Sequence, residues 1–146
     1  MNNILITSAG RRVSLIKYFK EASKKFKTGS KIFITDLNPK TAPSSYFAND
    51  SFKVGLFNDP DYVNNLLKIC LKNKISIIIP TIDTELVLLA KSKLLFKTNA
   101  IDIVISNINL IEILRDKITT NTFFNSLKIK TPIIFNKDNM KFPVFL

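Results

Sequence analysis

The sequence predicts a doubly wound α/β domain, with helices on both faces of a mainly parallel sheet of about five strands. Apolar runs of strand length alternate with helical patterns along the chain, which is typical of parallel sheets. The run over residues 75–80 is continuously apolar and rich in β-branched residues, as expected of a central strand that is covered on both faces. At 146 residues, 46% of them hydrophobic, the chain is long enough for one domain with a substantial core.

The first half of the chain gives three strands and one helix. Residues 3–7 form a short apolar run, and a helical pattern follows over about residues 11–27. Gly29 predicts a glycine cap at the end of that helix. The second strand covers residues 31–35 and ends in a turn, and a brief third strand covers residues 51–54. The apolar stripe of the helix consists of Val13, Ile16, Phe19, Ala22 and Phe26.

The second half continues this alternation. A capping side chain and Pro60 predict a helix start at residues 58–61, ahead of the strand at residues 75–80. Another helix begins at residues 81–83 and extends to about Leu94, and a fifth strand is expected over residues 101–105. Helical segments over residues 108–115 and 117–127, and an extended segment over residues 131–135, complete the prediction. The order of these elements predicts right-handed crossovers between parallel strands.

The basic charge is interpreted as a solvated surface. Lys+Arg 22 against Asp+Glu 11 gives a formal net charge of +11. Arg11, Arg12 and Arg115 are the only arginines, and the lysines are dispersed along helix faces. An AT-rich coding sequence produces such a lysine bias without selection for binding. A high positive charge can indicate that a protein binds nucleic acid. Because this charge is dispersed, we do not expect a nucleic-acid partner here.

Cysteine usage and hydropathy bear on the setting of the protein. The single cysteine, Cys70, rules out an internal disulfide and fits a reducing, cytoplasmic setting. The first apolar run is too short for a signal peptide, and no apolar stretch approaches the ~20 residues that a membrane helix needs. We expect a soluble protein without a membrane partner.

Three predicted loops are candidates for a binding site, at residues 8–12, 36–38 and 81–85. In a doubly wound sheet, ligands bind at the carboxyl ends of the strands, near the point where the strand order reverses. Each of these loops follows a predicted strand, so all three should lie at that edge.

The loop at residues 8–12 joins a strand to a helix and contains Gly10, Arg11 and Arg12. Backbone N–H groups and the helix dipole would attract an anion there, and the arginines would add charge-assisted hydrogen bonds to a carboxylate or phosphate. The alternative is that Gly10 only makes the turn and that the arginines are solvated. A single glycine argues against a dinucleotide site, which requires G-x-G-x-x-G.

The acidic residues of the other two loops each have two interpretations. Asp36 stands where a ribose-binding acid would lie, but an Asp-x-Asn-Pro sequence more often forms a self-bonded turn. Asp83 and Glu85 begin a helix, where acids are favourable to the dipole whatever the function. They could equally hold an amino or ammonium group of a small substrate.

Residues that usually carry out catalysis are scarce. The chain has no histidine, which excludes a histidine-based triad or an imidazole base. It also lacks a Walker A sequence, a nucleophile elbow and a paired-cysteine metal site. On its own residues, the chain is predicted to be a binding domain, with no catalytic or metal-ligating residue.

Segments at residues 3–13, 35–39, 79–86, 115–117, 123–124 and 129–132, in this order, resemble those of ATP-grasp proteins. The similarity is to proteins like the carbamoyl-phosphate synthase large subunit. It implies a three-layer, Rossmann-like pre-ATP-grasp domain over residues 1–128, followed by a linker and the truncated start of an ATP-grasp domain over residues 129–146. By position, Lys117 matches a basic residue that reaches the nucleotide in many members of that family.

The resemblance also implies a reaction for the intact protein. ATP and Mg²⁺ would convert a carboxylate into an acylphosphate, which an amine or similar nucleophile then attacks. The glycine-rich phosphate loop and the magnesium-holding carboxylates are missing, so the chain alone is not expected to catalyse a reaction or to bind ATP or Mg²⁺ tightly. The implied substrate contacts are Gly10, Arg11, Arg12, Asp83 and Glu85, and the implied ATP contact is Lys117.

The first functional hypothesis is therefore the substrate-side domain of an ATP-dependent carboxylate–amine ligase. The alternative is a free-standing binding or assembly module with the same fold and no ligase activity. The partners expected under the first hypothesis are a small-molecule carboxylate or amine and the missing ATP-grasp domain. A homodimer is also open, because an exposed cut interface would favour self-association.

Overall fold

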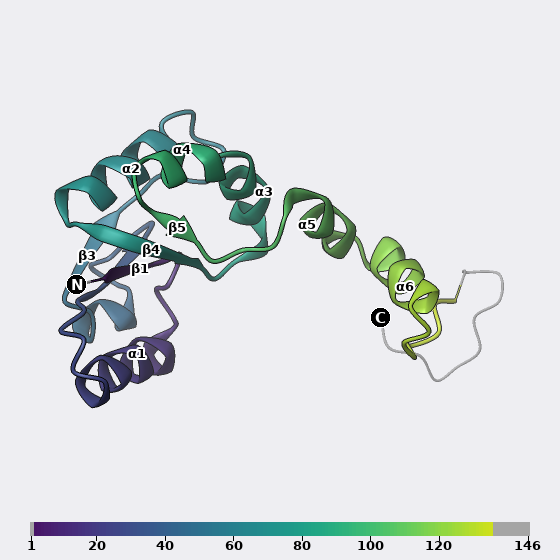
Figure 1. The fold of residues 1–146 in the computed structure, drawn as a ribbon, viewed down its shortest axis with the longest axis horizontal. Helices are drawn as coiled ribbons and strands as arrows, with labels where there is room; N and C mark the ends of the chain where they lie inside the picture. The colour runs from purple at the N-terminus through teal and green to yellow at the C-terminus, as the bar shows by residue number, and fades with distance from the viewer. Residues whose placement is uncertain (1, 136–146) are drawn as a thin grey trace. The chain divides into compact units, whose positions relative to one another are not determined.

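The fold is organised around a parallel sheet of five strands. The computed structural model describes residues 2–135. The strands lie in the order β3-β2-β1-β4-β5, and all neighbouring strands are parallel (Figure 1). This sheet confirms the predicted α/β fold. The strands are β1 (Asn3–Thr7), β2 (Ile32–Asp36), β3 (Asp50–Lys53), β4 (Ile75–Pro80) and β5 (Asp102–Ile103).

Helices cover both faces of the sheet. α1 (Val13–Lys25) lies on one face, and α2 (Tyr62–Lys72), α3 (Asp83–Lys91) and α4 (Lys93–Thr98) lie on the other (Figure 1). A short 3₁₀ helix, η1 (Pro43–Tyr46), follows β2 and packs near α1. The domain therefore has the three-layer, Rossmann-like architecture that the sequence predicts.

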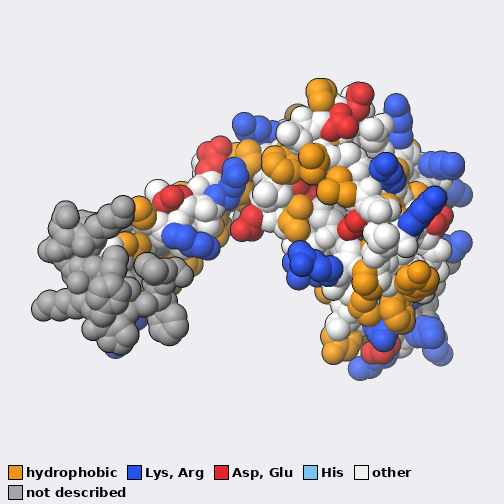
Figure 2. All heavy atoms as spheres, turned by 180° about the vertical axis from the view of Figure 1, so that it is seen from behind, with side chains coloured by type: hydrophobic (Ala, Val, Ile, Leu, Met, Phe, Trp, Pro, Cys, Tyr) orange, Lys and Arg blue, Asp and Glu red, His pale blue; other side chains and the backbone are white. Residues whose placement is uncertain are grey.

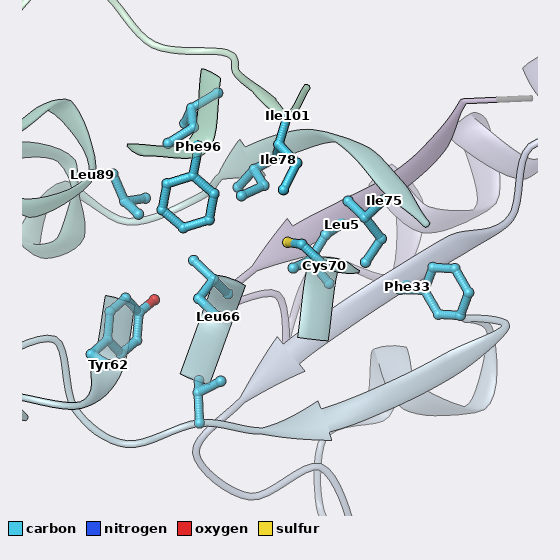
Figure 3. Packing of buried hydrophobic residues seen from close by; sticks show 12 residues of the cluster. Leu5, Phe33, Tyr62, Leu66, Cys70, Ile75, Ile78, Leu89, Phe96 and Ile101 are labelled. Carbon is cyan, nitrogen blue, oxygen red and sulfur yellow. The ribbon is translucent and has the colours of Figure 1, made fainter. Parts of the chain in front are cut away.

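Each face of the sheet has its own hydrophobic core, because successive side chains of a strand point to opposite sides. Leu5 of β1 belongs to the core under α2, α3 and α4, whereas the next residue, Ile6, packs in the core with Ile16 of α1. In the larger core, Phe96 of α4 points toward Ile78 of β4 (Figure 3). Burial on both faces explains why the strands read as unbroken apolar runs in the sequence.

The structure corrects several details of the predicted elements. The helix expected to extend to Leu94 is divided into α3 and α4, because Ser92, with ψ of 0°, turns the chain between them. β5 contains two residues, although residues 101–105 read as a strand. Ile101 is buried in the core but does not belong to the strand. An apolar run in the sequence indicates that residues are buried, and it does not show that they pair with a neighbouring strand. β4 is an interior strand, but the middle strand of the sheet is β1.

Four of the helices in the described chain end on a residue other than glycine in the left-handed region. At the end of α1, the Thr28 N–H donates to Ser23 O at 3.1 Å and the Lys27 N–H donates to Lys24 O at 3.1 Å. These are the two hydrogen bonds of a Schellman motif, and Lys27, with φ of 50°, occupies the position that Gly29 was predicted to take. Lys74 after α2, Ala100 after α4 and Lys128 after the later helix at residues 117–126 have the same conformation.

The start of α2 also differs from the prediction. The residue before the helix is Asp61, which makes no capping hydrogen bond with its side chain. Instead, Asp59 Oδ1 accepts a hydrogen bond from the Asp61 N–H at 2.9 Å, which forms a turn just ahead of the helix. Local side-chain bonds of this kind compete with true capping, so the sequence pattern marks the helix start but not the capping atom.

The chain divides into two compact units, and the first, Met1–Ile108, contains the whole sheet. Within the second, α6 (Lys117–Ser126) is capped at its start by Asp116, whose carboxylate accepts from the Ile118 and Thr119 amides at 3.0 and 2.8 Å. This bonding holds the pKa of Asp116 below its usual value. The helix before it, α5 (Ile108–Arg115), ends one residue earlier.

The extended segment predicted at residues 131–135 has no regular secondary structure. Asn121 Nδ2 donates to Thr131 Oγ1 and to Pro132 O, both at 2.8 Å, so the start of this segment is fastened to α6. The remaining residues predicted to begin a further domain, 136–146, lie outside the described part of the chain. Between residues 2 and 135, no helix combines the length and the apolar character that crossing a membrane requires.

Candidate functional site

Three loops meet at the carboxyl edge of the sheet. β1 lies between β2 and β4, so the chain order reverses beside β1, and the loops that follow these strands are neighbours there. They surround a hollow of roughly 260 Å³, the carboxyl-edge hollow. It is lined by Ser8, Gly10, Arg11, Arg12, Asp36, Leu37 and Ile82. The structure therefore brings together residues from each of the three loops that the sequence singled out.

Gly10 is held in close contact with Asp36. A methyl group at Gly10 would overlap Asp36 Oδ2 and would come within 2.9 Å of Asp36 Cγ, so the Asp36 carboxylate would have to shift to admit a larger residue. The Gly10 carbonyl also accepts a hydrogen bond from the Ser44 N–H at 3.1 Å, which ties the loop to η1. The close approach of Asp36 therefore favours glycine at position 10, whereas the backbone of Gly10 is not in the left-handed region that would itself favour glycine.

Asp36 forms the turn that the sequence predicts and also faces the hollow. Its Oδ1 accepts a hydrogen bond from the Asn38 N–H at 2.9 Å, the pattern of a self-bonded Asp turn. The same side chain lines the carboxyl-edge hollow. Sequence reasoning found the turn, but it did not place Asp36 beside Gly10, because that contact joins two different strands.

The two arginines give the hollow its positive charge. Both are exposed, and Arg12 Nη2 donates to the Thr81 carbonyl at 3.1 Å. α1 starts directly after Arg12, with no acidic residue in its first turn and no side-chain capping bond. The positive end of this helix therefore adds to the two guanidinium groups, an arrangement that favours an anionic ligand.

Ser8 has a strained backbone at the rim of the hollow. Its φ is 51°, a left-handed conformation that is uncommon for residues other than glycine. Its N–H donates to Thr35 Oγ1 at 3.4 Å, and its hydroxyl donates to Glu85 Oε2 at 3.3 Å. Such strain concentrates where a site has to be held in one geometry.

Glu85 is fully buried, whereas Asp83 is exposed at the start of α3. The Glu85 carboxylate accepts from Thr7 Oγ1 at 2.8 Å and from the Tyr62 hydroxyl at 2.6 Å, in addition to Ser8. Burial, followed by the charge and hydrogen bond of Glu85, raises the pKa of Tyr62 well above its usual range. Of the five predicted substrate residues, Gly10, Arg11 and Arg12 line the hollow, and Asp83 and Glu85 do not.

Three residues that were not among the predicted contacts also contribute to the site, namely Ser8, Thr7 and Tyr62. The first two belong to the end of β1 and the loop after it, a region that the sequence marked as a candidate binding loop without singling out either side chain. No local signal could have found Tyr62, which opens α2 and reaches Glu85 across 23 positions of sequence.

Comparison with known proteins decides the family. The PylC-like N-terminal domain matches residues 4–110, which is most of the chain. This chain belongs to the family of PylC-like N-terminal domains. The result confirms the predicted resemblance to the domain that precedes an ATP-grasp domain. No curated protein matches the chain.

Solved structures share the fold of this PylC-like domain at low sequence identity. The biotin carboxylase domain of a thermophilic 2-oxoglutarate carboxylase, bound to bicarbonate, has a TM-score of 0.59 and 14% identity over 90% of this chain and 29% of its own. The corresponding domain dimer from Hydrogenobacter thermophilus, in complex with MgADP and bicarbonate, gives 0.58 and 16% over 90% of this chain and 28% of its own.

Pyruvate carboxylase from Rhizobium etli has a TM-score of 0.59 and 12% identity over 91% of this chain and 13% of its own. The PylC-like chain thus spans less than a third of the length of these structures. Such likenesses establish the fold and assign no activity.

Lys117 lies in the second unit, at the first position of α6. It borders a second hollow, of roughly 320 Å³, whose other lining residues are Thr120, Asn121, Phe124, Thr131, Pro132 and Ile134. Asp116 already accepts from two amides at the start of α6. The charge available to a phosphate at this helix start is therefore that of the Lys117 side chain rather than that of those amides.

Side chains that could bind a metal ion are dispersed in the described part of the chain. Across residues 2–135, no three acidic, cysteine or histidine side chains gather into a group that could hold a metal ion. We assign no chemical step to Mg²⁺ here.

Proposed function

We propose that this chain is the substrate-side N-terminal domain of an ATP-dependent ligase of the ATP-grasp type, one that joins a carboxylate to an amine or a similar nucleophile. Family membership supports the domain type. Residues 1–128 would form the pre-ATP-grasp domain, and residues 129–146 would begin the ATP-grasp domain. The chain alone would bind substrate without catalysing the reaction, because phosphoryl transfer depends on metal and phosphate-binding groups that the ATP-grasp domain would supply.

The observation that carries this proposal is the carboxyl-edge hollow. Arg11 and Arg12 border it at the amino end of α1, and with Asp36 as the acidic residue of the lining, the hollow keeps an excess of positive charge. An Arg guanidinium pairs a carboxylate or a phosphoryl group through two parallel N–H groups. The hollow would therefore hold the anionic group of the substrate, a carboxylate before activation and an acylphosphate after it.

The related structures are longer than this chain, which spans less than a third of each, and the ligands bound to two of them are known for those proteins. Two of them, the 2-oxoglutarate carboxylase domains, contain bicarbonate, and one of these also contains MgADP. In the intact protein, ATP would supply the phosphoryl group that activates the carboxylate. Lys117 would attract a phosphate of the nucleotide beside the second hollow, and Asp83, exposed at the start of α3, would attract the amino group of a substrate.

The experiment that tests the hollow is a titration of the ¹⁵N-labelled chain with inorganic phosphate, followed by NMR. We expect shifts at residues 8–12 and a dissociation constant that rises about tenfold in Arg11→Gln and in Arg12→Gln, because each loses a charge-assisted contact. Lys68→Gln on α2 is the matched control, since it removes the same charge from an exposed site outside the hollow. Equal weakening in all three variants would leave only nonspecific attraction by the basic protein.

The wider ligase proposal is tested by the reading frame beyond Leu146 in the source gene. We expect it to continue into an ATP-grasp domain, and Lys117→Ala in that longer protein should weaken ATP binding. A stop codon directly after Leu146 would instead support a free-standing binding module.

A further inference from the structure

The strongest unexplained feature of the molecule is the buried carboxylate of Glu85. Its side chain is 0% exposed, yet it comes from the first turn of a helix at the edge of the sheet. Four donors surround it. Oε1 accepts from Thr7 Oγ1 at 2.8 Å and the Thr81 N–H at 3.4 Å, and Oε2 accepts from the Tyr62 hydroxyl at 2.6 Å and Ser8 Oγ at 3.3 Å. Two donors on each oxygen match the acceptor capacity of a carboxylate.

These donors come from three separate segments of the chain. Thr7 and Ser8 lie at the end of β1, Tyr62 opens α2, and Thr81 follows β4. Glu85 thus joins the loop after β1 to the loop after β4. These two strands are neighbours at the point where the chain order in the sheet reverses. It lies outside the lining of the carboxyl-edge hollow and would not touch a ligand there.

Thr81 completes the connection between the two loops. Its hydroxyl lies 2.9 Å from Thr7 O and 3.0 Å from Ser8 O, and its carbonyl accepts from Arg12 Nη2 at 3.1 Å. The Thr81 N–H is fixed by Glu85. Glu85 therefore orients Ser8 directly and reaches Arg12 through Thr81.

Stability alone does not explain a buried acid at this position. Apolar residues of similar volume often replace buried charged groups without loss of stability, because the carboxylate pays a desolvation cost. The strained backbone of Ser8 also has to be held in place by its partners, and one of these is Glu85. Both facts indicate a role in the geometry of the loop.

We propose that Glu85 is a positioning residue for the carboxyl-edge hollow. Through its buried hydrogen bonds, Glu85 fixes the loop at residues 8–12 in the conformation that presents Arg11 and Arg12 to an anion. The link to anion binding rests on the proposed function, whereas the fixing of the loop does not. The two parts can therefore be tested separately on the same protein.

Amide hydrogen exchange tests the loop without any ligand. The reporters are the amides of Ala9 and Arg12, which are bonded to Thr35 O at 3.1 Å and to Ala9 O at 2.8 Å. Val104, whose N–H donates to Ile78 O at 2.9 Å, reports on the other side of the sheet. In Glu85→Ala, we expect protection of Ala9 and Arg12 to fall at least about tenfold more than protection of Val104.

The matched control is Cys70→Ala, which truncates a fully buried side chain of α2 in the core that contains no residue of the loop. It should lower protection at all three amides together. Glu85→Gln should restore loop protection to within about threefold of the wild type, because the amide oxygen still accepts from the Thr81 N–H and the hydroxyls of Ser8 and Tyr62 can accept from the amide nitrogen. If Ala9 and Arg12 respond to Glu85→Ala no more than they do to Cys70→Ala, the proposal is overturned.

A second variant covers the case in which Glu85→Ala does not fold. Tyr62→Phe removes the shortest bond to Glu85 and keeps the shape of the ring. It should lower protection of Ala9 and Arg12 about threefold relative to Val104. Uniform loss at all three amides in this variant would also overturn the positioning role.

Inorganic phosphate then tests the functional part. If phosphate shifts the loop amides of the wild type, Glu85→Ala or Tyr62→Phe should weaken its affinity, while Cys70→Ala should not. Unchanged affinity in a variant whose loop has lost protection would overturn the link between Glu85 and the ligand. If the wild type shows no phosphate shifts, the proposed anion site fails, and the exchange result still decides whether Glu85 fixes the loop.

Discussion

The Asp36 carboxylate occupies the space that a side chain at Gly10 would need. A Cβ atom at Gly10 would overlap Asp36 Oδ2 and lie 2.9 Å from Asp36 Cγ. Asp36 is not free to swing away without loss, because its Oδ1 holds the Asn38 N–H at 2.9 Å. The loop after β1 and the end of β2 are therefore in close contact through Gly10 and Asp36. Both residues line the carboxyl-edge hollow.

Gly10→Ala is expected to destabilise the domain by about 1–2 kcal/mol, because the new methyl group displaces the Asp36 carboxylate from its turn. Chemical denaturation measures the change. The double variant Gly10→Ala/Asp36→Ala should be less destabilised than the sum of the two single variants, since the clash disappears with the carboxylate. Additive losses would mean that the two residues are not coupled.

The end of α1 offers a stabilising substitution. Lys27 has φ of 50°, so Lys27→Gly should raise the free energy of unfolding by about 0.5–1 kcal/mol. Lys27→Ala separates this effect from loss of the lysine side chain, and it should give little gain. Ala22→Gly, inside the same helix, should have the opposite sign. Thermal and urea unfolding of the three variants would test the prediction, and a gain in Lys27→Ala equal to that in Lys27→Gly would contradict it.

Alkaline pH should weaken the domain through Cys70. Burial raises the pKa of the Cys70 thiol from 9.0 to about 12. Between these values the unfolded chain has lost a proton that the folded chain keeps, so the free energy of unfolding should fall with rising pH, by up to about 1.4 kcal/mol per pH unit from this group. Below pH 9 the thiol is protonated in both states and the contribution is constant.

The comparison that isolates this group is the slope of unfolding free energy against pH in wild type and in Cys70→Ala. All other side chains are the same in both proteins, so their contribution cancels in the difference. The slope should be shallower in the variant above pH 9. Parallel slopes would show that Cys70 does not titrate differently in the folded state.

A chain shortened to residues 1–110 should fold by itself. Both hydrophobic cores consist of residues before position 106, and the first compact unit ends at Ile108. We expect a cooperative thermal transition within a few degrees of that of the full chain, measured by circular dichroism. A chain ending at residue 98 is the control, because it lacks β5 together with the buried Ile101 and Ile103, and it should not fold cooperatively. Loss of the transition in the 1–110 chain would place essential contacts beyond it.

Much of the fold could be predicted from the sequence because strands and helices here follow local rules. Two-sided burial made β1, β2 and β4 continuous apolar runs, and α5 and α6 were predicted almost to the residue. Local rules failed where tertiary contacts decided the outcome. Ile101 is buried without strand pairing, and Lys27 rather than Gly29 takes the left-handed position after α1. The domain boundary expected after residue 128 stays a prediction.

For the site, the sequence by itself determined which loops would meet and which charges they carry. The carboxyl ends of parallel strands share one edge, so the loop with Gly10, Arg11 and Arg12 had to lie near Asp36 and the start of α3. Only the tertiary structure decided how the acids are used. Asp36 lies against Gly10, Asp83 faces solvent, and Glu85 points inward to Tyr62 and Thr7. Side-chain direction at a helix start depends on the donors that other segments bring there, and those donors are remote in sequence.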